Sequence, residues 1–158
     1  LILYSTSHET NSKTMKISKS CNSTCSISVV VTWKNVPNTK SYDVIGAYLD
    51  GISLIKHSST KVKTSTSSNS SLEIQQEKSG FGVSISLPTS GSNYVISQTY
   101  TVSKGGTVYA SYQHAKSSIS LANSKNYTIS REGYGGVFKF SGTAKNIYDA
   151  MGGVSITV

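Results

Sequence analysis

The stretch Ser26-Ile-Ser-Val-Val-Val-Thr-Trp33 decides the fold class of this chain. Its apolar side chains fall on one side of an extended strand (Ile27, Val29, Val31 and Trp33), and its hydroxyl side chains fall on the other (Ser26, Ser28 and Thr32). This period of two is typical of a β-strand that buries one face and exposes the other. The sequence therefore predicts sheet structure here, with a polar face left in water.

Strand patterns recur along the chain. They appear in VSISLP (83–88), in YVISQTYTV (94–102), where Tyr94, Ile96, Gln98, Tyr100 and Val102 share one face, and in VFKFSG (137–142). We expect roughly nine to eleven short strands with a turn signal about every eight to twelve residues, a spacing typical of an antiparallel β-sandwich or jelly roll. The predicted fold class is therefore all-β.

Helix is expected to be a minor component, below about a sixth of the residues. The only stretch that we expect to be helical is 144–151 (AKNIYDAM), because Gly152 and Gly153 follow it as stop signals.

Three chain reversals are predicted to close hairpins. Asp50-Gly51 separates two strand-forming runs, and this pair favours the two-residue type I′ turn. Lys104-Gly-Gly106 is expected to turn residues 94–102 directly into the strand 107–115. A longer hairpin is predicted over about residues 58–78, with the serine-rich segment 67–71 at its tip.

One domain is expected, because 158 residues is a common size for a single hydrophobic core. We place the β-sandwich domain at 26–158 and describe 1–25 as an N-terminal arm or a first strand. The segment begins with four apolar residues, Leu1 to Tyr4, which we predict to be ordered and packed. Three readings compete: a first strand of the same sandwich, an arm that joins a neighbouring subunit into a homo-oligomer, and a remnant of a signal peptide.

The charge balance favours an anionic partner. The chain has 15 Lys and Arg against 7 Asp and Glu, so its formal net charge is +8. A positive potential of this kind attracts acidic glycans, wall polymers or lipid head groups, and we do not expect a nucleic acid as the specific partner. The alternative is that lysines keep exposed strands soluble and prevent them from pairing edge to edge.

The two cysteines lie four positions apart in Cys21-Asn-Ser-Thr-Cys25. A disulfide in so short a loop would contribute about 2 kcal/mol in the chain-entropy model. Two free thiols and a zinc site are the alternatives, but His8, His57 and His114 lack metal-ligand spacing. We therefore predict a disulfide and no metal.

The same features predict a secreted protein, extracellular or associated with a cell surface. Disulfides persist in oxidising compartments, and a chain that begins at Leu1 is expected to be a processed form. No stretch of about 18 apolar residues occurs, so no membrane-spanning helix is expected.

We expect no enzymatic activity and no cofactor. None of the seven acids sits in a motif that would pair it with a second carboxylate, and the glycine-rich segments lack the spacing of phosphate-binding loops. His114 is the most site-like histidine, because alternation places it on the face of Val108, Ala110 and Tyr112.

Tyrosines and lysines are the remaining candidates for binding, since aromatic rings stack on sugars while ammonium groups attract anions. The wider set comprises Tyr94, Tyr100, Tyr109, Tyr112, Tyr127, Tyr134 and Tyr148, with Lys104, Lys116, Lys125 and Lys139. The best candidates for ligand binding are Tyr109, Tyr112, His114, Tyr134, Lys104 and Lys116. Any single tyrosine is also a candidate for the core or for a cross-strand pair.

The sequence therefore predicts a secreted, non-catalytic binding domain that attaches to an anionic or carbohydrate polymer at a cell surface. A self-assembling extracellular structural subunit is the alternative, favoured by the Ser/Thr-rich strands. A β-pore-forming toxin is a third hypothesis, although the hairpin over 58–78 is too polar to insert by itself.

Overall fold

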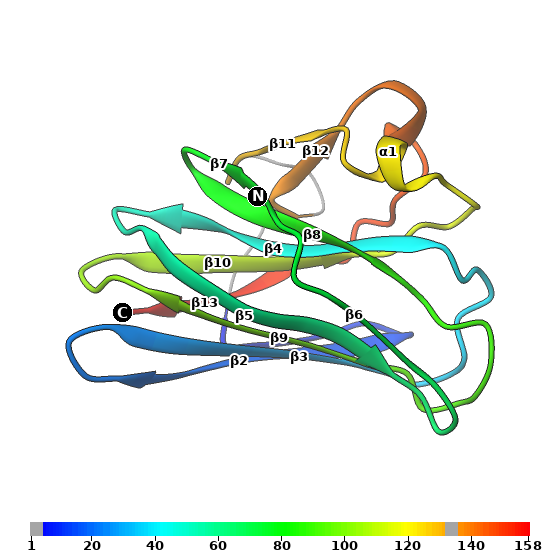
Figure 1. The fold of residues 1–158 in the computed structure, drawn as a ribbon, viewed down its shortest axis with the longest axis horizontal. Helices are drawn as coiled ribbons and strands as arrows, with labels where there is room; N and C mark the ends of the chain where they lie inside the picture. Colours follow the sequence, from blue (N-terminus) through cyan, green and yellow to red (C-terminus); the bar gives the residue numbers. More distant parts are fainter. Residues whose placement is uncertain (1–4, 132–135) are drawn as a thin grey trace.

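The computed structural model describes residues 5–131 and 136–158, which form two facing β-sheets and a small covering layer (Figure 1). In this part of the chain, sheet A has the order β1 (Ser7–Glu9), β2 (Lys13–Cys21), β3 (Cys25–Trp33), β9 (Val95–Val102), β5 (Leu54–Lys63) and β6 (Ser68–Ser71). Sheet B has the order β13 (Gly153–Thr157), β10 (Thr107–Gln113), β4 (Tyr42–Asp50), β8 (Gly80–Ser86) and β7 (Gln75–Glu77). Neighbouring strands run antiparallel. The all-β prediction is confirmed, with 55% strand and 5% helix.

The main core lies between the two sheets. In β3 every inward residue predicted from the alternation is buried, from Ile27 to Trp33, and the serine and threonine residues between them face out. Strand β9 repeats the pattern, with Ile96, Tyr100 and Val102 fully buried. Burial of each such side chain contributes about 1.5–3 kcal/mol, so the alternation itself drives the two sheets together.

A third layer, the cover layer, packs on the outer face of sheet B. It contains α1 (Leu121–Ser124), β11 (Tyr127–Ile129), β12 (Phe138–Phe140) and the 3-10 turn η1 (Gly142–Ala144), seen at the top of Figure 1. Tyr127 and Phe138 form a second apolar cluster with Val44 and Tyr109 of sheet B. Strand β10 is therefore buried on both faces, unlike the strands of sheet A.

The two glycine turns predicted as hairpins connect the two sheets instead. After Asp50-Gly51 the chain leaves sheet B for β5 in sheet A, and after Lys104-Gly-Gly106 it returns from β9 to β10. Gly51 has a φ of +74°, so the residue does permit a sharp reversal, but the strands on either side of it do not pair. The hairpin prediction was wrong because a turn signal fixes the reversal and not the sheet that the next strand joins.

The helix predicted over 144–151 does not form. Lys116 N donates to the Ile147 carbonyl at 2.8 Å, and Asp149 N donates to the His114 carbonyl at 2.9 Å. Pairing with the chain that follows β10 therefore takes the backbone groups that a helix would use. The α-helix lies at Leu121–Ser124, where the Ser120 hydroxyl accepts from Asn123 N and caps the first turn.

Residues 7–21, described above as part of an arm or a first strand, form β1 and β2 of sheet A. The prediction for residues 1–4 lies outside the described residues. The hairpin over 58–78 forms between β5 and β6, but its tip is at 64–67, because residues 68–71 pair with β5 as a strand.

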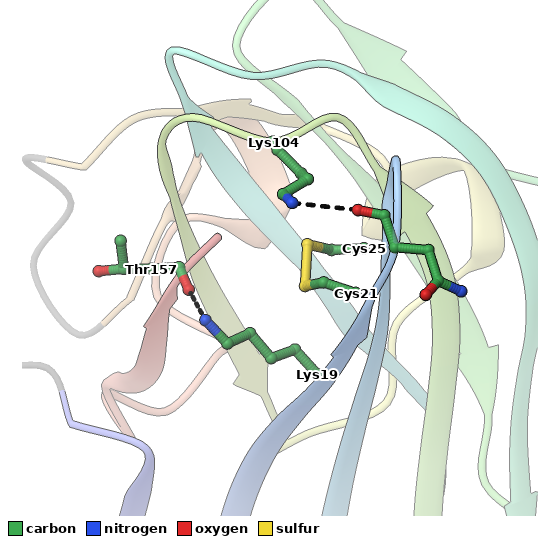
Figure 2. Close-up of a disulfide and its surroundings, with 6 residues drawn as sticks. Lys19, Cys21, Cys25, Lys104 and Thr157 are labelled. Carbon is green, nitrogen blue, oxygen red and sulfur yellow. Dashed lines mark hydrogen bonds between the residues drawn. A yellow bond between two sulfur atoms is a disulfide. The ribbon is translucent and has the colours of Figure 1, made fainter.

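The predicted disulfide joins Cys21 to Cys25 at the end of the β2–β3 hairpin (Figure 2). Two lysines lie on either side of it. Lys104 Nζ donates to the Asn22 carbonyl at 3.0 Å, and Lys19 Nζ donates to the Thr157 carbonyl at 2.6 Å. The disulfide therefore constrains the end of the β2–β3 hairpin. This end contacts both the β9–β10 connection and β13 of sheet B.

Reduction of this disulfide should lower the free energy of unfolding by about 2 kcal/mol, the chain entropy returned to the unfolded state by opening so short a loop. The matching fall in Tm is about 4–8 °C. Trp33, the single tryptophan, is buried and reports unfolding by fluorescence. Reductant should leave the Cys21→Ala/Cys25→Ala variant unchanged, and an equal fall in that variant would contradict the assignment.

Candidate functional site

A groove of about 460 Å³ lies at the rim of the cover layer, beside the end of β10. Its lining includes Lys139, Phe140, Lys145, Asn146, Tyr148 and Asp149. Strand β12 supplies the first two, and the turn segment after η1 supplies the others. The backbone pairing of residues 147–149 with 114–116, which replaces the predicted helix, holds that segment in place.

Two lysines give the groove its charge. Lys139 points outward because it alternates with the buried Phe138 and Phe140 along β12, and Lys145 is exposed just after η1. Neither forms an ion pair within residues 5–131 and 136–158. Both ammonium groups are therefore available to an anion in the groove.

Aromatic rings line the groove. The rings of Phe140 and Tyr148 are stacked, with centroids 3.9 Å apart and planes inclined by 5°. The Tyr148 hydroxyl donates to the Tyr42 carbonyl at 2.7 Å, which fixes the ring, and burial raises the pKa of Tyr148. Stacking covers one face of each ring and Phe140 is buried, so the half-buried Tyr148 is the ring that keeps exposed surface for a sugar to pack on.

Asp149 is the one carboxylate among the described residues that line the groove. Its side chain receives Lys13 Nζ at 2.5 Å and His114 N at 3.0 Å. Lys13 is almost completely buried and also lies over the Trp33 ring, 4.5 Å from the centroid. Because Lys13 neutralises Asp149 from inside the protein, the carboxylate does not oppose an anion held by the two groove lysines.

A fully buried carboxylate, Asp43, is connected through His114 to Asp149 of the groove. It accepts hydrogen bonds from the Tyr112 hydroxyl, from His114 Nδ1 at 2.9 Å and from Ala115 N at 2.9 Å. Trp33 Nε1 in turn donates to the Tyr112 oxygen at 3.2 Å. Burial raises the pKa of Asp43, and the hydrogen bonds from His114, Tyr112 and Ala115 oppose that rise. The network ties β3, β4 and β10 together.

The structure separates most of the residues selected from the sequence. Tyr112 and His114 do share a face, as predicted, but both are buried around Asp43. Tyr109 is buried on the opposite side of β10, with the Arg131 guanidinium 4.2 Å from its ring centroid. Lys104 lies beside the disulfide, and Lys116 is exposed in the loop after β10.

Tyr134 lies outside the described residues, so its predicted exposure stays a prediction. From the wider set of tyrosines and lysines, Lys139 and Tyr148 do line the groove. Sequence reasoning missed Lys145, Asn146 and Asp149, because nothing local shows that the segment 145–149 lies beside β12. Their only local signal was their position in a polar stretch close to Tyr148.

The comparisons with known proteins give no family. No protein-family model, curated protein or solved structure matches this chain.

The described residues contain no helix that is both long and apolar enough to cross a membrane. They also contain no group of three or more His, Cys, Asp or Glu side chains placed to hold a metal ion.

Proposed function

We propose that the protein is a secreted, non-catalytic binding domain that holds an acidic saccharide of a cell-surface polymer in the groove beside β12. The observation that carries the proposal is the pair of lysines Lys139 and Lys145, which have no acidic partner in the described part of the chain and lie beside the stacked rings of Phe140 and Tyr148. Ammonium groups bind carboxylate or sulfate groups, while the rings pack against the faces of sugars.

The arrangement of the acids supports an anionic ligand. Glu9, Glu73 and Asp149 are ion-paired with lysines, and Asp43 is buried against His114. Glu77 accepts a hydrogen bond from Ile129 N at 2.9 Å. Most described lysines therefore face solvent without a nearby carboxylate, and the net charge of +8 acts on the surroundings.

The sheet edges support binding over self-assembly by strand addition. In sheet A the edge strands β1 and β6 have three and four residues. In sheet B, β7 has three residues, and Ser155 of β13 already donates its N–H to the Ser5 carbonyl at 2.8 Å. Edges this short, or already bonded, give an added strand few hydrogen bonds.

The Lys139→Ser/Lys145→Ser variant should bind a heparin-derived tetrasaccharide about tenfold more weakly than the wild type, because each lost contact is worth about 0.5–1 kcal/mol. Titration calorimetry at two salt concentrations measures the change. Screening by salt should weaken the wild-type affinity more than that of the variant.

The matched control is Lys40→Ser/Lys78→Ser, which removes the same charge from two lysines that do not line the groove. Its affinity should stay within about twofold of the wild type. If both double variants weaken equally, net charge and not the groove binds the saccharide, and the proposed site is wrong.

A further inference from the structure

The outer face of sheet A has a composition that the groove does not explain. The inward residues of β2, β3 and β9 fill the core, so the residues between them face solvent. Every such outward residue on these three strands is serine or threonine, except Lys16, Val30 and Val95. We call this surface, together with the outward lysines of β5, the hydroxyl–lysine face.

The lysines of this face are aligned by the strand register. Lys16 of β2, Val30, Ser97 and Lys61 of β5 lie in one row across four strands, so the two lysine Cα atoms are about 14 Å apart. Lys63 is exposed two residues beyond Lys61 on the same side of β5, about 7 Å away. Lys56 is exposed further along the strand.

No carboxylate occupies an outward position on β2, β3, β5 or β9. None of the lysines at 16, 56, 61 and 63 forms an ion pair with any described residue. A shallow hollow of about 600 Å³ runs over β2 and β3, with Lys16 and Val30 in its lining and Thr6 at its border. At the edge of this surface Glu9 of β1 lies opposite Thr14, but it is ion-paired with Lys34. The outward positions of β2, β3, β5 and β9 therefore offer an anion cations and hydroxyl groups and no carboxylate.

This face and the groove lie on opposite sides of the layered structure. The groove belongs to the cover layer on the outer face of sheet B, whereas the hydroxyl–lysine face is the outer face of sheet A (Figure 1). Packed sheets are about 10 Å apart, so both sheets separate the two surfaces. A single extended ligand cannot follow a straight path over both.

We propose that the hydroxyl–lysine face is a second binding surface for an acidic polysaccharide chain, and that the protein joins two such chains. The joining of chains rests on the proposed function of the groove, whereas binding at sheet A does not. Ammonium groups at 16, 61 and 63 bind the acidic groups of the chain, and serine and threonine hydroxyls exchange hydrogen bonds with its sugar hydroxyls.

A chain-like partner fits this face better than a lipid bilayer. Neighbouring strands rotate by about 20–25°, so a sheet of several strands is twisted, and a flexible chain can follow it where a planar membrane cannot. Among the outward positions of β2, β3 and β9, Val30 and Val95 are the apolar ones, and neither is a large side chain that would insert among lipids.

The test compares three proteins: the wild type, the groove variant Lys139→Ser/Lys145→Ser, and the face variant Lys16→Thr/Lys61→Thr/Lys63→Thr. Threonine keeps the strand propensity and the hydroxyl character of the face. Circular dichroism and Trp33 fluorescence verify that each variant is folded. The probes are long-chain heparin and the heparin tetrasaccharide, and the readouts are affinity and light scattering.

The wild type should cross-link long heparin, with scattering that rises to a maximum near equivalence and falls in excess polymer. The face variant should bind the tetrasaccharide in the groove with an affinity within about twofold of the wild type, but should bind long heparin about tenfold more weakly and give no scattering. The groove variant should lose scattering and retain binding of long heparin.

Each failure points to a different surface. If the groove variant binds the tetrasaccharide as tightly as the wild type, the proposed function of the groove fails, and the affinity of the face variant for long heparin still tests sheet A. If the face variant cross-links like the wild type, the second surface is refuted.

Two controls test the partner and the charge. If the Lys40→Thr/Lys78→Thr/Lys116→Thr variant weakens as much as the face variant, net charge alone explains binding, and the proposal is overturned. If the wild type binds vesicles of phosphatidylserine and phosphatidylcholine more tightly than long heparin, and the face variant loses this binding, the partner of sheet A is a membrane and not a polysaccharide.

Discussion

Replacing Asp43 with alanine should lower the free energy of unfolding by about 3–5 kcal/mol, because each buried donor left without its acceptor costs about 1–3 kcal/mol. The Tyr112 hydroxyl, His114 Nδ1–H and Ala115 N–H all donate to this carboxylate inside the protein. Without it, three buried donors lose their acceptor at once. A domain at the lower end of the usual range of stability, about 5 kcal/mol, would then be close to unfolding.

Urea denaturation followed by Trp33 fluorescence measures this loss, and the probe lies next to the network, 4.7 Å from the His114 ring centroid. Asp50→Ala is the matched control, because Asp50 is exposed at the end of β4. Its effect should be within about 0.5 kcal/mol. Equal losses for the two variants would show that the Asp43 network contributes nothing special to stability.

Raising the pH above about 10 should unfold the protein in one cooperative step. Burial raises the pKa of the Tyr100, Tyr112 and Tyr127 phenols above the value of about 10 found in an unfolded chain. The stabilisation is therefore complete below pH 10 and is lost as the pH rises towards the folded-state pKa values. These three phenols alone lose about 4 kcal/mol per pH unit, so a domain of about 8 kcal/mol unfolds at or below about pH 12.

Absorbance at 295 nm and circular dichroism, recorded together, test this prediction. Tyrosinate should appear at the pH at which the sheet signal disappears. Titration of all ten tyrosines near pH 10 in a protein that stays folded would contradict it.

Two Tyr→Phe variants measure what the hydroxyl groups of Tyr100 and Tyr112 each contribute to stability. The Tyr100 hydroxyl is buried and has no hydrogen-bond partner among the described residues. Tyr100→Phe should therefore keep or raise stability at pH 7 and move alkaline unfolding to higher pH. Tyr112→Phe should lower stability at pH 7, because Asp43 loses a donor.

The fold class could be predicted because it depends on local patterns. The alternation in β3 and β9 depends on neighbouring residues only, and the residues assigned to the core are buried there. The Cys21–Cys25 bond was equally local, since only the hairpin between the two cysteines had to form.

The sheet to which each strand belongs could not be predicted from turns. A signal for it was present in the strands themselves. Strand β4 is apolar on both faces, as suits a strand between the core and the cover layer, whereas β5 alternates and carries lysines. This difference in burial pattern fits the placement of β4 and β5 in different sheets, which neither glycine turn reveals.

The groove depends on contacts between distant residues. Lys139 and Tyr148 belonged to the wider set of candidates, but nothing local shows that 147–149 pairs with the chain after β10. Tyr112 and His114 do share one face, as predicted. They are buried because this face of β10 packs against sheet A, where Trp33 of β3 contacts both side chains.

The two connections between the sheets also bear on how fast the chain folds. Neither Asp50-Gly51 nor Lys104-Gly-Gly106 closes a hairpin, so β4 pairs only with strands that are distant in the sequence. Ala47, for example, lies opposite both Phe81 and Ala110. Pairings between distant residues require large loops to close before any contact compensates for the lost entropy. Domains dominated by such contacts refold in milliseconds to seconds, much more slowly than helical bundles of similar stability. During that interval the Ser/Thr-rich outer positions of sheet A leave the unpaired strands polar on one side, which protects the unfinished sheet from other chains.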